Sequence, residues 1–377
     1  MKLLFAISSL RGGGAEGVMC TLANEMTNKG HDVILVTTTN HHVYSLSDKV
    51  KLLEAKSWRY DTSKGSLISR IYKKAANRFK DYKHLRKIIR KEQPELVMSF
   101  LVQWLASLVL ICKFRIPLIF ADRNAAEFKF GRNNFIIRKI WFRLADVVQV
   151  MSYHDVAYLK NSYRKVVYMP NPLRFNPISS SEYKEGFAKR KNILAVGRLD
   201  PQKGFDKLID AFSMIAANHP EWDVDICGED MVGKHYSEYL KGKVRNHQLE
   251  NRVHFIGFHK DIDKIMREHS IFCLSSKHEG FPNVLSEAMA NGMACISFDI
   301  VTGPHEIIMD GLDGEIVENQ DVRALSQGLE RLMSDNDLRY SYGLHAIDNI
   351  KRYSRDRIVD KWEKLFSNTI NDYYGNN

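Results

Sequence analysis

Two glutamates stand eight residues apart in the stretch "SSKHEGFPNVLSEAMANG", positions 275–292. Glu279 precedes a Gly-Phe-Pro loop, and Glu287 lies in the first turns of a predicted helix that Asn283 or Ser286 is expected to cap or open. A carboxylate at the mouth of the loop can accept hydrogen bonds from sugar hydroxyls, and one on the helix can hold both hydroxyls of a ribose. The alternative is that Glu279 is an exposed loop acid and Glu287 a partner of the helix dipole.

A pair of cations occurs earlier, in the stretch "VGRLDPQKGFD". Arg198 ends a predicted strand, and Lys203 lies five residues further on, where the next helix begins. A planar guanidinium, a compact ammonium and a helix N-terminus together favour a diphosphate ligand. Two solvated surface charges are the alternative for such a pair.

Three glycines follow the first predicted strand in "ISSLRGGGAEG". Glycines at that place let the backbone approach a ligand, and the helix that follows favours an anion at its N-terminus. A dinucleotide fingerprint would need its third glycine at Gly17 and an acidic residue after the next strand, where threonines follow Val36. The pattern therefore disfavours a nicotinamide cofactor.

Metal ligands are not expected. Asp223 and Asp225 form one D-x-D pattern inside a predicted buried strand, and Asp261 and Asp263 form another that opens a helix. The five cysteines are scattered without a C-x-x-C pair, which disfavours a zinc site or a disulfide framework and fits a reducing compartment. The sequence therefore predicts neither a metal nor another cofactor.

Strands and helices alternate in both halves of the chain. Apolar strands such as "KLLFAIS" and "NILAVG" alternate with predicted helices such as 67–92 and 204–217. This alternation indicates α/β domains with parallel, doubly wound sheets, whose ligands bind at the carboxyl ends of the strands. We expect an N-terminal domain at 1–172, completed by the C-terminal helix 355–377, and a second domain at 190–354.

Two apolar segments resemble membrane signals. The opening "MKLLFAISSL" leads into the glycine loop without a cleavage site, so a buried strand is favoured. The segment 96–112 is uncharged for 17 residues, but it divides naturally into a strand and a helix that contains Gln103 and Ser107. We therefore expect no membrane-spanning helix.

Positive charge is concentrated in the first half of the chain. Residues 1–170 contain 29 Lys and Arg against 13 Asp and Glu, whereas the remainder contains 26 against 32. Eleven of these cations lie in 64–91, at spacings that leave a helical apolar stripe, and a second basic and aromatic cluster lies in 128–143. Such helices suit an anionic membrane surface, although a solvated helix packed on its own domain would have the same pattern.

Taken together, these motifs resemble the family-four retaining glycosyltransferases. The resemblance extends over most of the chain, through the glycine loop, "GRLDPQKG", "VHFIGF", "EGFPNVLSE" and "SFDIVTGPHEII". It implies the GT-B fold, in which two Rossmann-like domains face each other across a cleft. It also implies that Arg198 and Lys203 hold the donor diphosphate, that Glu279 contacts the transferred sugar and that Glu287 contacts the ribose.

The resemblance extends to the neighbouring residues. It implies that the backbone of Gly13 and Gly14 faces the donor and that the base lies near Phe258. It also assigns to donor binding the loop residues Gly280, Phe281, Pro282 and Asn283.

Two positions depart from the family pattern. Gly17 stands after Glu16, where many relatives have arginine, and Arg123 stands where some relatives carry a histidine that touches the sugar. We therefore assign Glu16 and Arg123 to the acceptor or sugar side of the site.

The predicted activity is transfer of a hexose or N-acetylhexosamine from a UDP-sugar, without a metal, to a polyprenyl-diphosphate-linked oligosaccharide. The segment "TGPHEII" is similar to one found in enzymes of bacterial surface polysaccharide synthesis (O-antigen, capsule and exopolysaccharide). This similarity predicts that the protein works at the cytoplasmic face of the inner membrane. A GT-B nucleotide-sugar epimerase and a non-catalytic protein that binds membranes or nucleic acid are the alternatives, and a nucleic-acid partner is not expected. The sugar, the linkage and the oligomeric state stay open.

Overall fold

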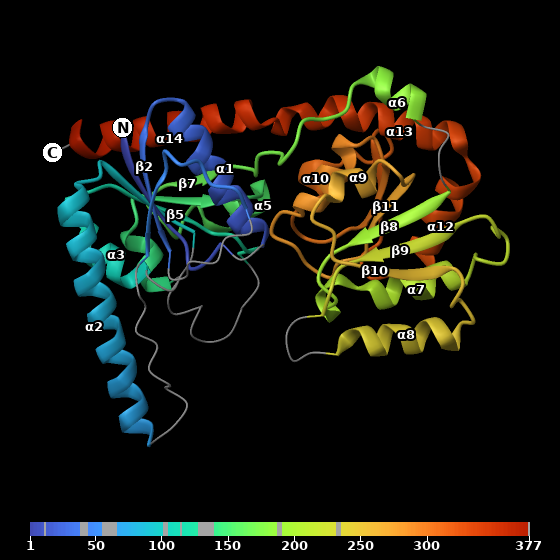
Figure 1. The fold of residues 1–377 in the computed structure, drawn as a ribbon, viewed down its shortest axis with the longest axis horizontal. Helices are drawn as coiled ribbons and strands as arrows, with labels where there is room; N and C mark the ends of the chain where they lie inside the picture. Colours follow the sequence, from blue (N-terminus) through green and yellow to red (C-terminus); the bar gives the residue numbers. More distant parts are fainter. Residues whose placement is uncertain are drawn as a thin grey trace. The chain divides into compact units, whose positions relative to one another are not determined.

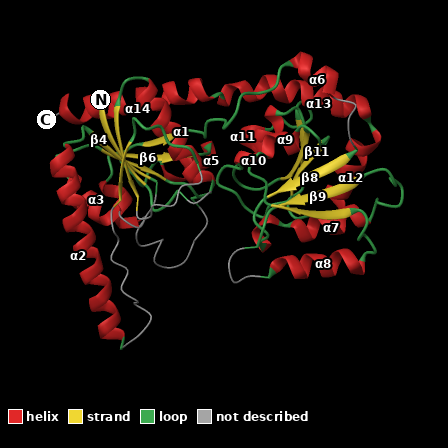
Figure 2. Cartoon of the chain, viewed as in Figure 1, coloured by secondary structure: helices red, strands yellow, loops and turns green. Residues whose placement is uncertain are grey.

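The computed structural model describes residues 1–10, 13–37, 44–54, 66–100, 105–113, 115–126, 139–186, 191–230 and 235–375. The chain divides into two compact units. The first unit contains Met1–Arg174 together with Asp356–Asn377, and the second contains Phe175–Arg355. Each unit is an α/β domain built on a parallel sheet (Figures 1 and 2).

The first unit contains a seven-stranded parallel sheet in the order β3-β2-β1-β4-β5-β6-β7. The register pairs Leu3 of β1 with Val33 of β2 on one side and with Leu96 of β4 on the other. The strands are β1 (Lys2–Ala6), β2 (Asp32–Thr37), β3 (Lys51–Glu54), β4 (Leu96–Ser99), β5 (Leu118–Ala121), β6 (Val147–Val150) and β7 (Val166–Tyr168).

Helices cover both faces of this sheet because β1 is apolar at successive positions. Leu4 packs in one cluster with Leu85 of α2 and Leu108 of α3. Phe5 points the other way, and its ring lies 5.7 Å from that of Phe366 in the C-terminal helix α14. The helices of this unit are α1 (Gly14–Asn28), α2 (Leu67–Glu92), α3 (Leu105–Cys112), α5 (Tyr153–Leu159) and α14 (Arg355–Gly375), with a 3₁₀ turn η2 at Phe142–Leu144.

The second unit contains a six-stranded parallel sheet in the order β10-β9-β8-β11-β12-β13. Its strands are β8 (Asn192–Val196), β9 (Asp223–Cys227), β10 (Val253–Gly257), β11 (Ile271–Leu274), β12 (Ala294–Phe298) and β13 (Gly314–Val317). In Figure 1, α7 (Phe205–Ser213) and α8 (Tyr236–Asn246) lie on one side of this sheet, and α9 (Ile262–Met266) and α10 (Asn283–Ala290) lie on the other. Its remaining helical segments are α6 (Ser180–Gly186), η3 (Pro201–Lys203), α11 (Pro304–Ile307), α12 (Val322–Ser334), α13 (Asn336–Asn349) and η4 (Ile350–Tyr353).

The sequence predicted the α/β class, and the two doubly wound sheets confirm it. The long basic helix has the predicted bounds, 67–92. The predictions differ from the structure in three details: α7 ends at Ser213 instead of 217, and neither α6 nor β3 was predicted. Most of the basic and aromatic cluster at 128–143 lies outside the described residues.

The apolar segment 96–112 forms β4 and α3, with residues 101–104 outside the described part. Among the residues that the structure describes, no helix is both long enough and apolar enough to cross a bilayer.

Candidate functional site

Most of the predicted donor-site residues lie along the carboxyl edge of the second sheet. Phe258 follows β10, Arg198 follows β8 and Glu279 lies in the loop after β11. In the observed strand order these residues follow one another along a single edge, with β9 between the first two. Phe258 is 61% exposed, and Arg198 is exposed as well. This is the edge at which ligands bind in open α/β sheets.

Glycines allow the ends of β8, β9 and β10 to lie against one another. The amide of Gly228, after β9, donates to the carbonyl of Gly257 at 2.8 Å. A Cβ atom on Gly228 would lie 1.8 Å from the carbonyl oxygen of Gly197, and its φ of +150° is unusual for other residues. The backbone at this edge is therefore tightly packed between Arg198 and Phe258.

Lys203 and Glu279 form the central contact of the site. The Lys203 ammonium lies 2.7 Å from Oε1 of Glu279, and the two side chains are only 15% and 11% exposed. The stem of Lys203 runs over Gly197, where a Cβ atom would lie 2.9 Å from Cε. Oε1 also accepts a hydrogen bond from the Ser276 hydroxyl at 2.7 Å. The residues predicted for the diphosphate and for the sugar therefore lie side by side.

Hydrogen bonds hold together the two loops that carry this pair. The Gln202 side chain donates to the carbonyl of His278 at 2.9 Å, and its backbone carbonyl accepts from the amide of Lys277 at 2.8 Å. The Ser275 hydroxyl donates to the carbonyl of Lys203 at 2.9 Å. Gly204 has a φ of +63°, and a Cβ atom there would lie 2.0 Å from the Ser275 carbonyl oxygen. The two loops therefore form one packed assembly.

The loop after Glu279 is fixed from a third direction. Thr302, after β12, donates its hydroxyl to the backbone carbonyl of Glu279. Gly303 has a φ of +106°, and a Cβ atom there would lie 2.5 Å from Cδ of Pro282. Phe281 is buried, and its ring meets that of Tyr353 edge-on at 5.6 Å. Gly280 lies between these anchors, so the whole loop is positioned by packing.

Glu287 is buried on α10, with 7% of its surface exposed. The helix begins at Asn283 and Pro282 is its N-cap, which has no side-chain capping bond. Ser286 lies inside the helix and is buried, so its predicted role as a cap was wrong, whereas Asn283 does open the helix. A buried carboxylate has less freedom to move than an exposed one. Glu287 therefore differs from an exposed glutamate that interacts only with the helix dipole.

His278 lies beside the ion pair. Burial holds the pKa of its imidazole below the ordinary value, although the Glu279 carboxylate acts in the opposite direction. The ring is therefore neutral at neutral pH and adds no second positive charge next to Lys203.

Glu16, Gly13 and Gly14 lie at the start of α1 in the first unit. A Cβ atom on Gly13 would lie 2.2 Å from Oε2 of Glu16, so the glutamate folds back over the glycine. The Tyr44 hydroxyl donates to the Gly13 carbonyl at 3.1 Å, and its ring lies 3.1 Å from where a Cβ atom of Gly17 would be. The Tyr44 ring therefore occupies the space beside Gly17.

Arg123 follows β5 at the carboxyl edge of the first sheet. Its guanidinium lies 4.6 Å from the centre of the Phe100 ring, and Nη2 donates to Oδ1 of Asn171. Nε and Nη1 are buried, and neither has a hydrogen-bond partner in the described structure. Burial lowers the pKa of Arg123 to about 10, while the carboxylates of Asp122 and Glu16 act to raise it. The side chain stays charged at neutral pH.

The two acids of the first D-x-D pattern bind protein groups. Asp223 forms an ion pair with Arg252 at 2.9 Å, and Asp225 lies 2.8 Å from Nε2 of His269. Within the described ranges, no group of three or more His, Cys, Asp or Glu side chains is arranged to hold a metal ion.

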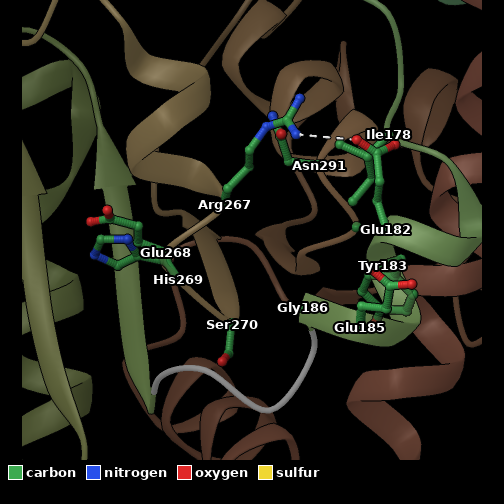
Figure 3. Close-up of a pocket in the computed structure, with 11 residues that line it drawn as sticks. Ile178, Glu182, Tyr183, Glu185, Gly186, Arg267, Glu268, His269, Ser270 and Asn291 are labelled. Atoms are coloured by element: carbon green, nitrogen blue, oxygen red, sulfur yellow. Dashed lines mark ion pairs between the residues drawn. The ribbon is translucent and has the colours of Figure 1, made fainter.

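A pocket of about 290 Å³ opens elsewhere in the second unit (Figure 3). It lies between α6, the end of α9 and the turn after α10, and Ser270 and Gly292 line it just before β11 and β12 begin. These are the amino ends of the strands. The pocket is therefore separate from the edge that carries Lys203 and Glu279.

Comparison with known proteins identifies the family. Residues 12–174 match the family model described as Glycosyltransferase Family 4, and residues 180–348 match the model described as Glycosyl transferases group 1. The chain belongs to the family-four glycosyltransferases. It is therefore a retaining glycosyltransferase with the GT-B fold, which favours the transferase over the epimerase and over the non-catalytic alternative.

Relatives match nearly the whole chain. A Campylobacter jejuni protein named GalNAc-α-(1→4)-GalNAc-α-(1→3)-diNAcBac-PP-undecaprenol α-1,4-N-acetyl-D-galactosaminyltransferase is 26% identical over 373 residues, 98% of this chain and 99% of that protein. The amylovoran biosynthesis glycosyltransferase AmsD of Erwinia amylovora is 28% identical over 376 residues, 97% and 99% of the two chains. The structure of Anabaena HepE in complex with UDP and glucose has a TM-score of 0.78 at 20% identity, covering 98% and 100%.

Four residues of the assembly were not predicted: Gln202, Ser275, Ser276 and Thr302. The side chain of each donates a hydrogen bond to a loop carbonyl or to the Glu279 carboxylate. Their only sequence signal is that each lies within or next to a recognised motif, which does not identify the partner.

Proposed function

We propose that this glycosyltransferase moves a hexose or N-acetylhexosamine from a UDP-sugar to a polyprenyl-diphosphate-linked oligosaccharide. The observation that carries the proposal is the carboxyl edge of the second sheet, where Lys203 and Glu279 form an ion pair and Arg198 is exposed after β8. Glu287 is buried on α10, the helix that follows the Glu279 loop. Cations for a diphosphate and carboxylates for two sugars are the groups that a nucleotide-sugar requires.

Each half of the substrate assignment has support among the relatives. HepE was solved with UDP and glucose, which favours a UDP-sugar as donor. The name of the C. jejuni relative specifies an undecaprenyl-diphosphate glycan, which favours a lipid-linked acceptor in surface glycan synthesis.

In the proposed reaction, the bond between the anomeric carbon and the β-phosphate oxygen of the donor breaks. The acceptor hydroxyl bonds to the same face of that carbon, and its proton passes to the departing phosphate oxygen. Negative charge grows on the UDP, where Arg198 and Lys203 stabilise it. Glu279 orients the transferred sugar through its hydroxyls, and Glu287 holds the ribose. The reaction as proposed uses no metal.

We assign the remaining donor contacts to the backbone of Gly13 and Gly14, to the surface at Phe258, and to the loop from Gly280 to Asn283. The first unit would then hold the acceptor through Glu16 and Arg123. These roles follow from the resemblance and from the position of each residue at a carboxyl strand edge.

The basic helix α2 fits a membrane surface. Its aromatic side chains Tyr72 and Phe79 are 74% and 57% exposed, and the ammonium of Lys83 lies 4.7 Å from the centre of the Phe79 ring. Leu85 and Ile89 on another side of the helix are buried in the core. A groove on the exposed face is lined by Phe79, Tyr82, Lys83, Arg86, Lys87, Arg90 and Lys91. We propose that this face binds anionic lipid at the cytoplasmic face of the inner membrane.

The test of this function uses a panel of radiolabelled UDP-sugars with a bacterial membrane lipid extract. We expect label from one donor to enter the lipid fraction with the wild type and not with Lys203→Ala. Release of free sugar or epimerised donor with no labelled lipid would contradict the proposal.

A further inference from the structure

Tyr153 is an exposed aromatic residue at the carboxyl edge of the first sheet. It is the first residue of α5, which begins three residues after β6 ends, and it is 64% exposed. Its ring packs against that of Tyr168, the last residue of β7, with the centroids 4.1 Å apart and the planes at 30°. Tyr168 therefore supports the ring from one side while most of the side chain stays accessible.

Two short connections tie this tyrosine pair to Arg123. The buried carboxylate of Asp155, two residues after Tyr153, accepts a hydrogen bond at 2.9 Å from the amide of Ala126. Ala126 lies three residues after Arg123, a span of at most roughly 11 Å of extended chain. On the other side, Asn171 lies three residues after Tyr168 and accepts from the Arg123 guanidinium. The tyrosine pair and Arg123 are thus close enough for one oligosaccharide.

The surroundings of Arg123 favour a neutral ligand. Nε and Nη1 carry three N–H donors, which are buried without an acceptor in the described residues, and leaving them so is unfavourable. The carboxylates of Asp122 and Glu16 already act on the guanidinium. An added carboxylate or phosphate would place a third negative charge beside one cation and would be repelled by the two carboxylates. A hydroxyl or acetamide oxygen would accept hydrogen bonds from the Arg123 N–H groups without that repulsion.

We infer that the Tyr153–Tyr168 pair is a platform for a neutral pyranose ring of the acceptor glycan. Arg123 binds polar oxygens of the same glycan. A pyranose has one face made largely of C–H groups, and packing that face on an aromatic ring removes apolar surface from water. The inference rests on the proposed function, because it identifies the part of the acceptor that the first unit recognises.

Three variants test the platform. Tyr153→Ala removes the ring, Tyr153→Phe keeps it, and Tyr158→Ala removes another exposed tyrosine, 55% exposed, from the same helix. We expect only Tyr153→Ala to raise the lipid-extract concentration needed for half-maximal transfer, by about tenfold, as for removal of a central contact residue. UDP affinity by calorimetry should stay the same in all three, and each variant should remain folded at the assay temperature. An unchanged half-maximal concentration in Tyr153→Ala would overturn the inference.

A binding measurement separates this inference from the proposed function. Saturation-transfer NMR of methyl α-glucopyranoside and methyl N-acetyl-α-galactosaminide, with UDP present, should show transfer to ring C–H protons in the wild type, Tyr153→Phe and Tyr158→Ala. The transfer should be lost in Tyr153→Ala. If wild-type protein transfers no sugar to lipid yet shows this pattern, the proposed function fails and the platform stands. Two results would overturn the platform. One is equal saturation transfer in all variants, and the other is that Tyr153→Ala no longer co-sediments with anionic vesicles to which the wild type binds.

Discussion

The charged side chains at the carboxyl edges of the two sheets differ in their hydrogen-bond partners. In the second unit, Lys203 and Glu279 bind each other at 2.7 Å, and the Ser276 hydroxyl shares the same carboxylate oxygen. In the first unit, the Arg123 guanidinium packs on Phe100, and three buried N–H donors on its Nε and Nη1 have no acceptor among the described residues. One edge is therefore internally satisfied, and the other has hydrogen-bonding capacity for a ligand.

This difference fits separate roles for the two units, with the donor bound by the second and the acceptor by the first. Ion-pairing and loop hydrogen bonds hold the second edge in one geometry, as a site for a charged transition state requires. The first edge combines the unaccepted Nε and Nη1 donors of Arg123 with an exposed tyrosine, which suits neutral, hydroxyl-rich groups. Substitutions at the two edges should accordingly affect different substrates.

The largest expected effect comes from Lys203→Ala. We expect turnover to fall by one to three orders of magnitude, because the departing diphosphate loses a positioned cation, a loss of about 2.7–4 kcal/mol for a comparable donor. Single-turnover assays of sugar transfer measure it. Lys207→Ala, which removes a lysine bonded to the Gln320 carbonyl, is the matched control. Normal turnover in folded Lys203→Ala would remove this residue from the chemistry.

The next effect concerns the basic helix of the first unit. Replacing Lys83, Lys87 and Lys91 by glutamine should weaken binding to anionic vesicles by roughly 100-fold, since each cation near the surface contributes about 1 kcal/mol. Raising the salt concentration should weaken wild-type binding in the same assay. The control replaces three exposed lysines of the second unit, Lys241, Lys260 and Lys264.

Co-sedimentation with vesicles decides between α2 as a membrane surface and α2 as a solvated helix. Equal loss in both triple variants would mean that net charge alone governs binding, and no loss in either would leave α2 an ordinary exposed helix.

A smaller effect should distinguish the roles of Glu279 and Glu287. Glu287→Gln should weaken UDP binding by about tenfold, because the buried carboxylate that we propose to hold two ribose hydroxyls would lose charge-assisted hydrogen bonds. Glu279→Gln should keep UDP affinity and lose transfer, since its proposed partner is the donor sugar. Calorimetric titration with UDP measures both variants. Equal affinities would show that the two roles are wrongly divided.

The smallest effect concerns how α14 is anchored in the first unit. The ammonium of Lys29 and the imidazole of His31 hold the pKa of Glu363 below its usual value. The folded-state pKa is therefore lower than the unfolded one, so this stabilisation is present above about pH 4.3 and is lost as the pH falls through the folded-state pKa. Glu363→Gln should lower the free energy of unfolding at pH 7 by about 1 kcal/mol or less.

Thermal unfolding of wild type and Glu363→Gln checks this at two pH values. The difference in Tm should be measurable at pH 7 and should shrink as the pH falls below about 4.3. A difference that does not change with pH would mean that Glu363 acts through packing.

Much of the fold followed from the sequence because its strands are apolar on both faces and its long helix has clear periodicity. β3 was missed because none of its four residues is buried, and α6 because Tyr183 is its one buried residue, too little to stand out in a polar stretch. The motif residues were placed on the correct loops. The ion pair between Lys203 and Glu279 was not foreseen, because 76 residues separate them and only the sheet order brings their loops together.

The division of labour between the two units is tested most directly by measuring both substrates in Lys203→Ala and Arg123→Met. Calorimetry gives the UDP affinity, and transfer assays over a range of lipid extract give the concentration for half-maximal rate. We predict that Lys203→Ala weakens UDP and leaves that concentration unchanged, whereas Arg123→Met raises the concentration and leaves UDP affinity unchanged. Loss of UDP affinity in Arg123→Met, with no change in its use of the lipid extract, would contradict this account.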